Sequence, residues 1–189
     1  MKAGRLARDF FRPAHDPGGG GKRQGDFVRH GDRSVEQLIR GEIEREFPGD
    51  GFFGEETAPS FGGSDQRVWV VDPVDGTHNF LRGVRYYCVS IAYVQRGRCE
   101  VGAVFDPEHD ELFHARRGHG AWLEQSGTEQ RLRMSDCASL ASAFVCLGHH
   151  DRRPEPRYIA IRHALMDRGA AMRNMGAGAL QLAHVAADR

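Results

Sequence analysis

The chain has 189 residues, of which 40% are hydrophobic and 28% are charged, as is usual for a globular protein. Its 26 basic and 26 acidic residues give a formal net charge of zero. This balance provides no electrostatic footprint for nucleic acid or an anionic membrane, so we expect neither as a partner. An anionic ligand would have to be held by a local device, such as a metal ion or a group of backbone amides.

The N-terminus and the cysteines indicate the compartment. No run approaches the roughly 18 apolar residues of a membrane span, and the charges scattered through residues 1–15 argue against a secretory signal. The four cysteines, Cys88, Cys99, Cys137 and Cys146, form no CxxC pair. Reduced thiols are therefore favoured over disulfides, and we expect a cytoplasmic protein.

The N-terminal part is predicted to be mainly helical. Residues 1–12 and 34–47 have apolar side chains at helical spacing. Between them, the glycines within 13–25 predict a flexible loop, and residues 26–28 are interpreted as a short strand.

A run of strands follows in the middle of the chain. Residues 67–71 are apolar on both faces, which is typical of a strand inside a sheet. Further strands are predicted at short intervals, separated by turn signals, at 87–95, 99–105, 111–116 and 121–124. Close spacing with tight turns predicts an antiparallel meander.

Strands and helices alternate after residue 138. We predict strands at 143–147 and 172–175 and helices at 157–167 and 178–187, with Gly169 as a left-handed cap. This alternation is typical of an α/β unit, but two such pairs bury little core. We therefore expect an N-terminal metal-binding α+β domain at 1–138 and a partial C-terminal α/β domain at 139–189.

Acidic residues stand at the edges of several predicted elements, at Asp32, Glu55, Asp72 and Asp75. Carboxylates supply the oxygens and the negative charge that a hard cation such as Mg²⁺ prefers. Asp72 and Asp75 are separated by a proline-stiffened turn, so their side chains can converge on one point. The carbonyl of Val74 is then free to serve as a further ligand.

Gly76 and Thr77 follow these aspartates directly. If a helix begins there, its free amides would form an anion site beside the metal. The Thr77 hydroxyl can orient a water molecule. A metal, carboxylates, a hydroxyl and free amides are together the components of metal-assisted phosphate ester hydrolysis.

Each of these residues also has a plain structural interpretation. Asp32 precedes the predicted helix at 34–47 and would serve there as its N-cap. Glu55 would be a solvated loop residue. The stretch 72–76 would be an ordinary turn, because Asp, Pro and Gly are favoured in turns. The residues alone leave these alternatives open.

The stretch DPVDGTHNF at 72–80 resembles the signature of the inositol monophosphatase family. The GEE at 54–56 is similar to the family's glutamate motif, and GDFVRHGD at 25–32 is similar to its first aspartate segment. The meander from 89 to 122 also resembles the corresponding family region. The resemblance implies a Mg²⁺-dependent, lithium-sensitive phosphatase that is commonly a homodimer. It also implies a layered α+β fold of the αβαβα sugar-phosphatase type, with N-terminal helices on an antiparallel sheet.

The same resemblance implies roles for the acidic residues and their neighbours. Glu55, Asp72 and the Val74 carbonyl would hold the first metal, and Asp72 and Asp75 would contribute to a second. Glu55 and Thr77 would activate the attacking water, and Asp32 would position Thr77 or a further metal. Substrate contacts would come from Asp75, Gly76 and Thr77, the last two through backbone amides that hold phosphate.

The chain departs from the family pattern at three places. Arg29 stands where the family usually has threonine, and the family's Gly-Ser/Thr-Ala-Ala motif is Gly-Ala-Gly-Ala at 176–179. The chain also ends before a Trp-Asp motif that completes the family's second metal site, which predicts weak or absent activity for these 189 residues. Inositol monophosphate is the default substrate. The alternatives are another sugar phosphate or histidinol phosphate, or a truncated, non-catalytic protein that binds metal or a partner.

Overall fold

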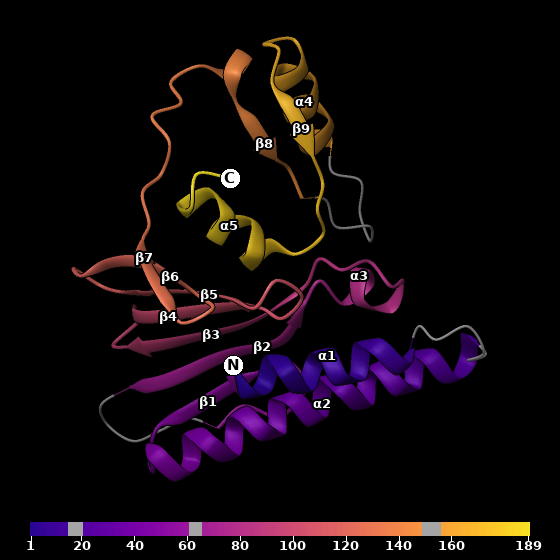
Figure 1. Ribbon diagram of the computed structural model, residues 1–189, viewed down its shortest axis with the longest axis vertical. Helices are drawn as coiled ribbons and strands as arrows, with labels where there is room; N and C mark the ends of the chain where they lie inside the picture. The colour runs from indigo at the N-terminus through magenta and orange to yellow at the C-terminus, as the bar shows by residue number, and fades with distance from the viewer. Residues whose placement is uncertain (15–20, 61–65, 149–155) are drawn as a thin grey trace.

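The computed structural model describes the backbone of residues 1–14, 21–60, 66–148 and 156–189, and within these ranges the side chains other than those of 12–14 and 21–28. The molecule is layered (Figure 1). Two long helices cover one face of a seven-stranded sheet, and helix α5 and a small C-terminal unit lie beyond the other face. This arrangement confirms the predicted layered α+β fold.

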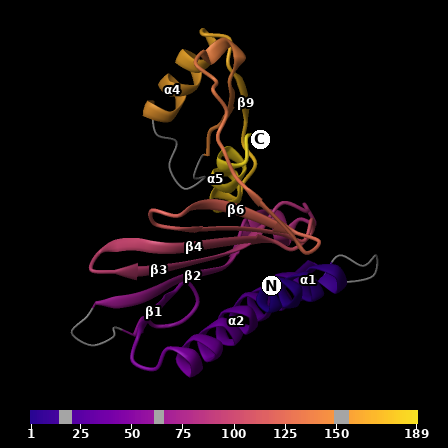
Figure 2. The same cartoon turned by 60° about the vertical axis from the view of Figure 1, so that its left-hand side comes forward.

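The helical layer consists of α1 (Lys2–Ala14) and α2 (Gly21–Glu46), which lie side by side (Figures 1 and 2). Both predicted helices are present, but α2 begins much earlier than expected. The strand predicted at 26–28 is therefore wrong, and so is the loop at 13–14 and 21–25, while residues 15–20 lie outside the described residues. Local composition suggested a break here, but packing of the two helices against each other overrides it. At Gly31 an added Cβ would lie only 3.0 Å from the Phe10 side chain, so the glycine permits this close packing.

The sheet follows chain order throughout, from β1 to β7. β1 pairs with β2 in parallel, and all the later neighbours pair antiparallel, which confirms the predicted meander. The strands are β1 (Gly51–Gly54), β2 (Arg67–Asp75), β3 (Cys88–Gln95), β4 (Arg98–Asp106), β5 (Glu111–Arg116), β6 (Gly120–Gln125) and β7 (Thr128–Arg131). Sequence reasoning missed β7 because this edge strand is polar and exposed at every position, and thus has no alternating pattern.

Strand β2 contains an irregularity that places the acidic signature. The strand continues past the predicted end at 71, but its register with β3 shifts between Asp72, which pairs with Ser90, and Asp75, which pairs with Cys88. Bulges of this kind bend a strand and re-aim its side chains. The short helix α3 (Thr77–Leu81) follows directly.

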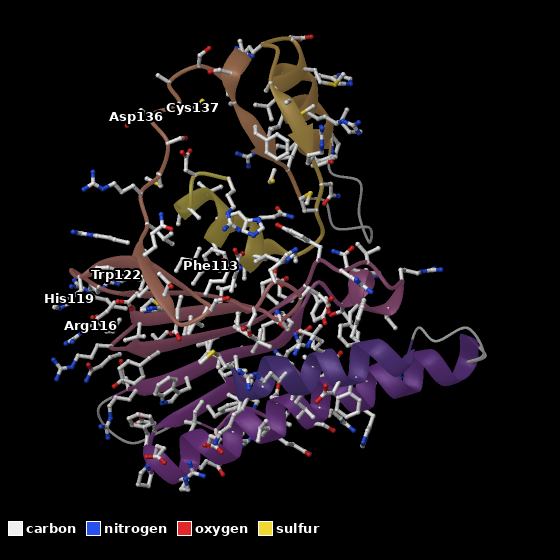
Figure 3. All side chains as sticks on the ribbon, in the orientation of Figure 1. Phe113, Arg116, His119, Trp122, Asp136 and Cys137 are labelled. Atoms are coloured by element: carbon white, nitrogen blue, oxygen red, sulfur yellow. The ribbon has the colours of Figure 1, made fainter. Side chains whose placement is uncertain are left out.

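Two apolar clusters hold the layers together. The first joins α1 and α2 to the sheet and to α3, with buried residues Ala7, Phe11, Val35, Ile39, Ile43, Phe52, Val71, Val74, Phe80, Tyr87 and Val89. The second joins the other face of the sheet to α5, with buried residues Cys88, Phe113, Leu123, Ala177, Leu180 and Ala183. Figure 3 shows Phe113 directed from β5 into the space below α5.

The C-terminal part contains the expected alternation. It comprises a 3₁₀ turn η1 (Leu140–Ser142), β8 (Phe144–Cys146), α4 (Pro156–Met166), β9 (Ala171–Arg173) and α5 (Gly178–Ala186). The extended segment that contains Asp136 and Cys137 leads up to this unit (Figure 3). β8 and β9 form a separate parallel pair, whereas α5 packs on the large sheet. Gly169 has the predicted left-handed conformation, with φ of 76°. The division at 138/139 stays a prediction.

All four cysteines are free thiols, and Cys88 is buried. Among the described residues, no helix combines the length and the apolar character that crossing a membrane requires.

Candidate functional site

The signature turn depends on Gly76, which has φ of 98° and ψ of 33°. This is the left-handed region, where a side chain is strained. The surroundings are also crowded, because a Cβ on Gly76 would lie 3.0 Å from the Tyr86 carbonyl oxygen and 3.1 Å from the Ala177 Cβ. Both conditions require glycine, and they bring the start of α3 against the segment that precedes α5.

Asp72 lies at the start of the bulge beside two other carboxylates. Its Oδ1 accepts a hydrogen bond from the Val74 amide at 3.1 Å. Burial, the charges of Glu55 and Asp75, and a hydrogen bond with Glu55 raise the pKa of Asp72 well above its ordinary value. The structure therefore brings Glu55, from the end of β1, next to Asp72, with Asp75 nearby.

Asp32 joins this group from the helical layer. It lies well inside α2 and is 5% exposed, so the alternative that it caps a helix N-terminus is wrong. Burial and the charges of Glu56 and Glu55 raise the pKa of Asp32 to about 7. Its Oδ1 is buried and has no hydrogen-bond partner among the described residues.

The chemistry of this donor set fits a divalent cation. Burial and the nearby charge of Glu55 raise the pKa of both Asp32, on α2, and Asp72, on β2. A buried carboxylate oxygen without a partner is normally costly, and a bound cation would remove that cost. We name this set, Asp32, Glu55 and Asp72, the carboxylate cluster.

Val74 and Thr77 contact each other within the turn. The Thr77 hydroxyl donates a hydrogen bond to the Val74 carbonyl at 3.1 Å. The sequence suggested that this carbonyl is free, but one of its acceptor positions is occupied. A carbonyl oxygen has two lone pairs, and one remains for a metal. The threonine hydroxyl likewise keeps its lone pairs and can accept a hydrogen bond from water.

Asp75 has a structural partner that the sequence did not reveal. Its two carboxylate oxygens accept hydrogen bonds from the amides of Gly178, at 3.1 Å, and Ala179, at 2.6 Å. These amides open α5, whose N-cap residue, Ala177, provides no side-chain cap. Asp75 therefore caps α5, and its charge also contributes to the raised pKa of Asp72.

Two further polar residues support the site and were missed. Glu36 is fully buried in α2, and its Oε2 accepts a hydrogen bond from the Glu56 amide at 2.8 Å, which fixes the loop that carries Glu55. The Asn79 side chain donates to the carbonyls of Tyr86 and Met175, both at 2.7 Å. A glutamate one helical turn after Asp32 was a usable signal for the first, but the Asn79 contacts required the fold.

Among the described residues, the group of metal-ligating side chains whose ligand atoms all lie within 4.8 Å of one another is Asp106, Glu111 and His184, and the carboxylate cluster is not gathered that tightly. Asp106 accepts hydrogen bonds from the amides of Glu108 and His109. Glu111 binds both terminal nitrogens of Arg189, which lowers the Glu111 pKa. Because the Arg189 guanidinium already neutralises the Glu111 carboxylate, we interpret the group as a structural ion-pair network.

Comparison with known proteins decides the family. The family model described as the inositol monophosphatase family matches residues 2–189, almost the full length of the chain. The chain belongs to the inositol monophosphatase family. It is 37% identical to an inositol-1-monophosphatase of Rhizobium meliloti (strain 1021) and 36% identical to the Nus factor SuhB of Escherichia coli (strain K12). Each alignment covers 100% of this chain and 70% of the relative.

The fold of this chain is similar to those of solved structures. The extragenic suppressor protein suhB of Bartonella henselae superimposes with a TM-score of 0.87 at 31% identity, covering 100% of this chain and 72% of that chain. The Mycobacterium tuberculosis SuhB gives a TM-score of 0.84 at 28% identity, covering 100% and 70%.

Proposed function

We propose that the protein hydrolyses a phosphate monoester by activation of a water molecule at the carboxylate cluster, in the presence of Mg²⁺. The observation that carries this proposal is the convergence of Asp32, Glu55 and Asp72 from three separate parts of the chain, where burial and the charge of Glu55 raise the pKa of both aspartates. When bound there, Mg²⁺ would lower the pKa of a coordinated water and neutralise charge that develops on the phosphoryl group.

The residues of the chain would bind the metal, orient the attacking water and contact the phosphate. Glu55, Asp72 and the Val74 carbonyl would hold the metal, and Asp32 would contribute to a further metal or position Thr77. Glu55 and Thr77 would orient the attacking water, because the Thr77 hydroxyl donates to Val74 and keeps its acceptor capacity for the water. Asp75, Gly76 and Thr77 would contact the phosphate side of the substrate.

The narrower expectations belong to the same proposal. Inositol 1-phosphate is the first substrate to test, because the family and a 37% identical relative carry that name. A cytoplasmic location and a homodimer stay predictions. Light scattering of the purified protein would show whether it is a homodimer.

The decisive experiment is phosphate release from inositol 1-phosphate with and without Mg²⁺, in protein shown to be folded by circular dichroism. Glu55→Gln should abolish Mg²⁺-dependent turnover, because it removes a ligand charge without changing size. Glu44→Gln, the same change at an exposed position of α2, should leave turnover unchanged. Folded wild-type protein without Mg²⁺-dependent turnover would refute the enzymatic function.

A non-catalytic, metal-binding protein is the second candidate. The specific observation in its favour is that both oxygens of Asp75 already accept hydrogen bonds from α5 amides. Calorimetric Mg²⁺ binding that Glu55→Gln weakens, together with absent turnover in the wild type, is the result that would favour it.

A further inference from the structure

A basic recess lies beside the carboxylate cluster, along α2. It has a volume of about 350 Å³ and is lined by Arg29, His30, Arg33 and Glu56. Arg29 and Arg33 are one helical turn apart, so their side chains lie on the same face of the helix. We name this feature the arginine recess.

The arginine recess adjoins the carboxylate cluster on two sides. Asp32 and Glu36 lie within one turn of the two arginines, and helical geometry places all four side chains within a single arc of the α2 surface. Asp32 and Glu36 are the buried members of this arc, and Arg29 and Arg33 are its exposed members. Glu56, which lines the recess, directly follows Glu55.

The two guanidinium groups are available to a ligand. Neither Arg29 nor Arg33 makes a hydrogen bond or a salt bridge within the described part of the chain, although the charges of both act on Glu56, which lines the same recess. Other arginines of the structure, such as Arg40, Arg67 and Arg189, are each paired with a carboxylate. The planar guanidinium fork matches the oxygens of a phosphate or carboxylate, and two such forks on adjacent turns can bind one anion together.

We propose that Arg29 and Arg33 bind a second anionic group of the substrate, a phosphate or a carboxylate, while the scissile phosphate lies at the carboxylate cluster. The inference rests on the proposed function and names its substrate class: a small polyol or sugar phosphate that carries two anionic groups. The zero net charge of the chain supports a local device of this kind, since no general field attracts such a ligand. Arg29 and Arg33 are then specificity-determining residues that do not take part in the bond-breaking step.

The test compares three ligands by calorimetry in the presence of Ca²⁺, which supplies divalent charge to the carboxylates. Glucose 6-phosphate carries one anionic group, 6-phosphogluconate adds a carboxylate, and glucose 1,6-bisphosphate adds a phosphate. The wild type should bind at least one of the ligands with two anionic groups about tenfold more tightly than glucose 6-phosphate, a difference of about 1.4 kcal/mol. Which of the two it prefers identifies the second group.

The variants are designed to separate a specific contact from a general charge effect. The double variant Arg29→Gln/Arg33→Gln should lose this preference and leave the affinity for glucose 6-phosphate unchanged. Arg29→Lys/Arg33→Lys should retain part of it, because the charge remains but the fork is lost. Arg98→Gln, at an exposed position of β4, should change nothing. Circular dichroism of each variant checks the fold.

Two outcomes would overturn the inference. One is equal binding of all three ligands by the wild type. The other is an equal loss for all three in the Arg29→Gln/Arg33→Gln variant. Turnover of inositol 1-phosphate in Mg²⁺ is measured separately. Its absence refutes the proposed function, whereas the calorimetric preference decides the role of the two arginines whether or not turnover occurs.

Discussion

The signature residues are constrained by the backbone as much as by chemistry. Gly76 has a left-handed conformation, and a Cβ there would lie 3.0 Å from the Tyr86 carbonyl oxygen, so it joins the β2 bulge to α3 in a space that is tight for any side chain. Asp72 precedes it and caps its own turn through the Val74 amide. The interpretation of 72–76 as turn residues is therefore confirmed, whereas the role of these residues as metal ligands stays a prediction.

Gly76→Ala should lower the free energy of unfolding by more than Gly97→Ala does. Both glycines have positive φ, so both changes incur the strain of the left-handed region, on the order of 1–3 kcal/mol. Only Gly76 adds a steric clash, because nothing lies within 4 Å of a Cβ at Gly97. Urea unfolding of the two variants measures the difference. Equal losses would show that the surroundings of Gly76 relax freely.

The elements were predicted well where their burial is periodic. The apolar face of α2 and the β2–β6 meander follow from spacing and turn residues, and the structure confirms them. The polar edge strand β7 and the early start of α2 depend on packing partners that local sequence does not contain. Asp75 illustrates the limit most clearly. Its spacing from Asp72, which is typical of metal ligands, can be recognised in the sequence. Its capping role cannot, because the Gly178 amide that it binds is 103 positions away in the chain.

Asp75→Asn should weaken α5 as well as the proposed chemistry. A carboxylate at a helix N-terminus accepts amide hydrogen bonds and interacts favourably with the helix dipole, so its loss should cost about 0.5–2 kcal/mol. Asp188→Asn is the matched control, because Asp188 follows the C-terminal end of the same helix, where a negative charge is unfavourable. Thermal unfolding and hydrogen exchange at the Gly178 and Ala179 amides measure the effect. Unchanged exchange in Asp75→Asn would contradict the cap.

At the scale of the whole molecule, the proposed site lies where separate layers meet. α2 supplies Asp32 and the sheet supplies Asp72, while the start of α5 binds Asp75. Charge repulsion in the carboxylate cluster thus opposes the packing of the helical layer on the sheet. The free energy of unfolding should therefore depend on protons and on divalent cations together.

The direction of this dependence follows from the raised pKa values. The Asp32 pKa of about 7 exceeds its ordinary value of 3.8, so between these limits the folded protein binds more protons than the unfolded chain. Without metal, stability should fall as pH rises through this window and be lowest above pH of about 7. Mg²⁺ should raise the melting temperature more at pH of about 8 than at pH of about 5, because protons and the cation compete for the same oxygens.

Asp32→Asn makes this prediction specific to the carboxylate cluster. In EDTA at pH of about 8, the variant should melt at a higher temperature than the wild type, because it removes one of the repelling charges. For a chain of this size each 1 kcal/mol corresponds to a shift of about 2–4 °C, which scanning calorimetry resolves. Mg²⁺ should also raise the melting temperature of the variant less than that of the wild type, because the neutral asparagine amide replaces an anionic ligand. If it melts below the wild type in EDTA and keeps the full Mg²⁺ effect, Asp32 belongs to the hydrophobic packing of α2 and not to a cation site.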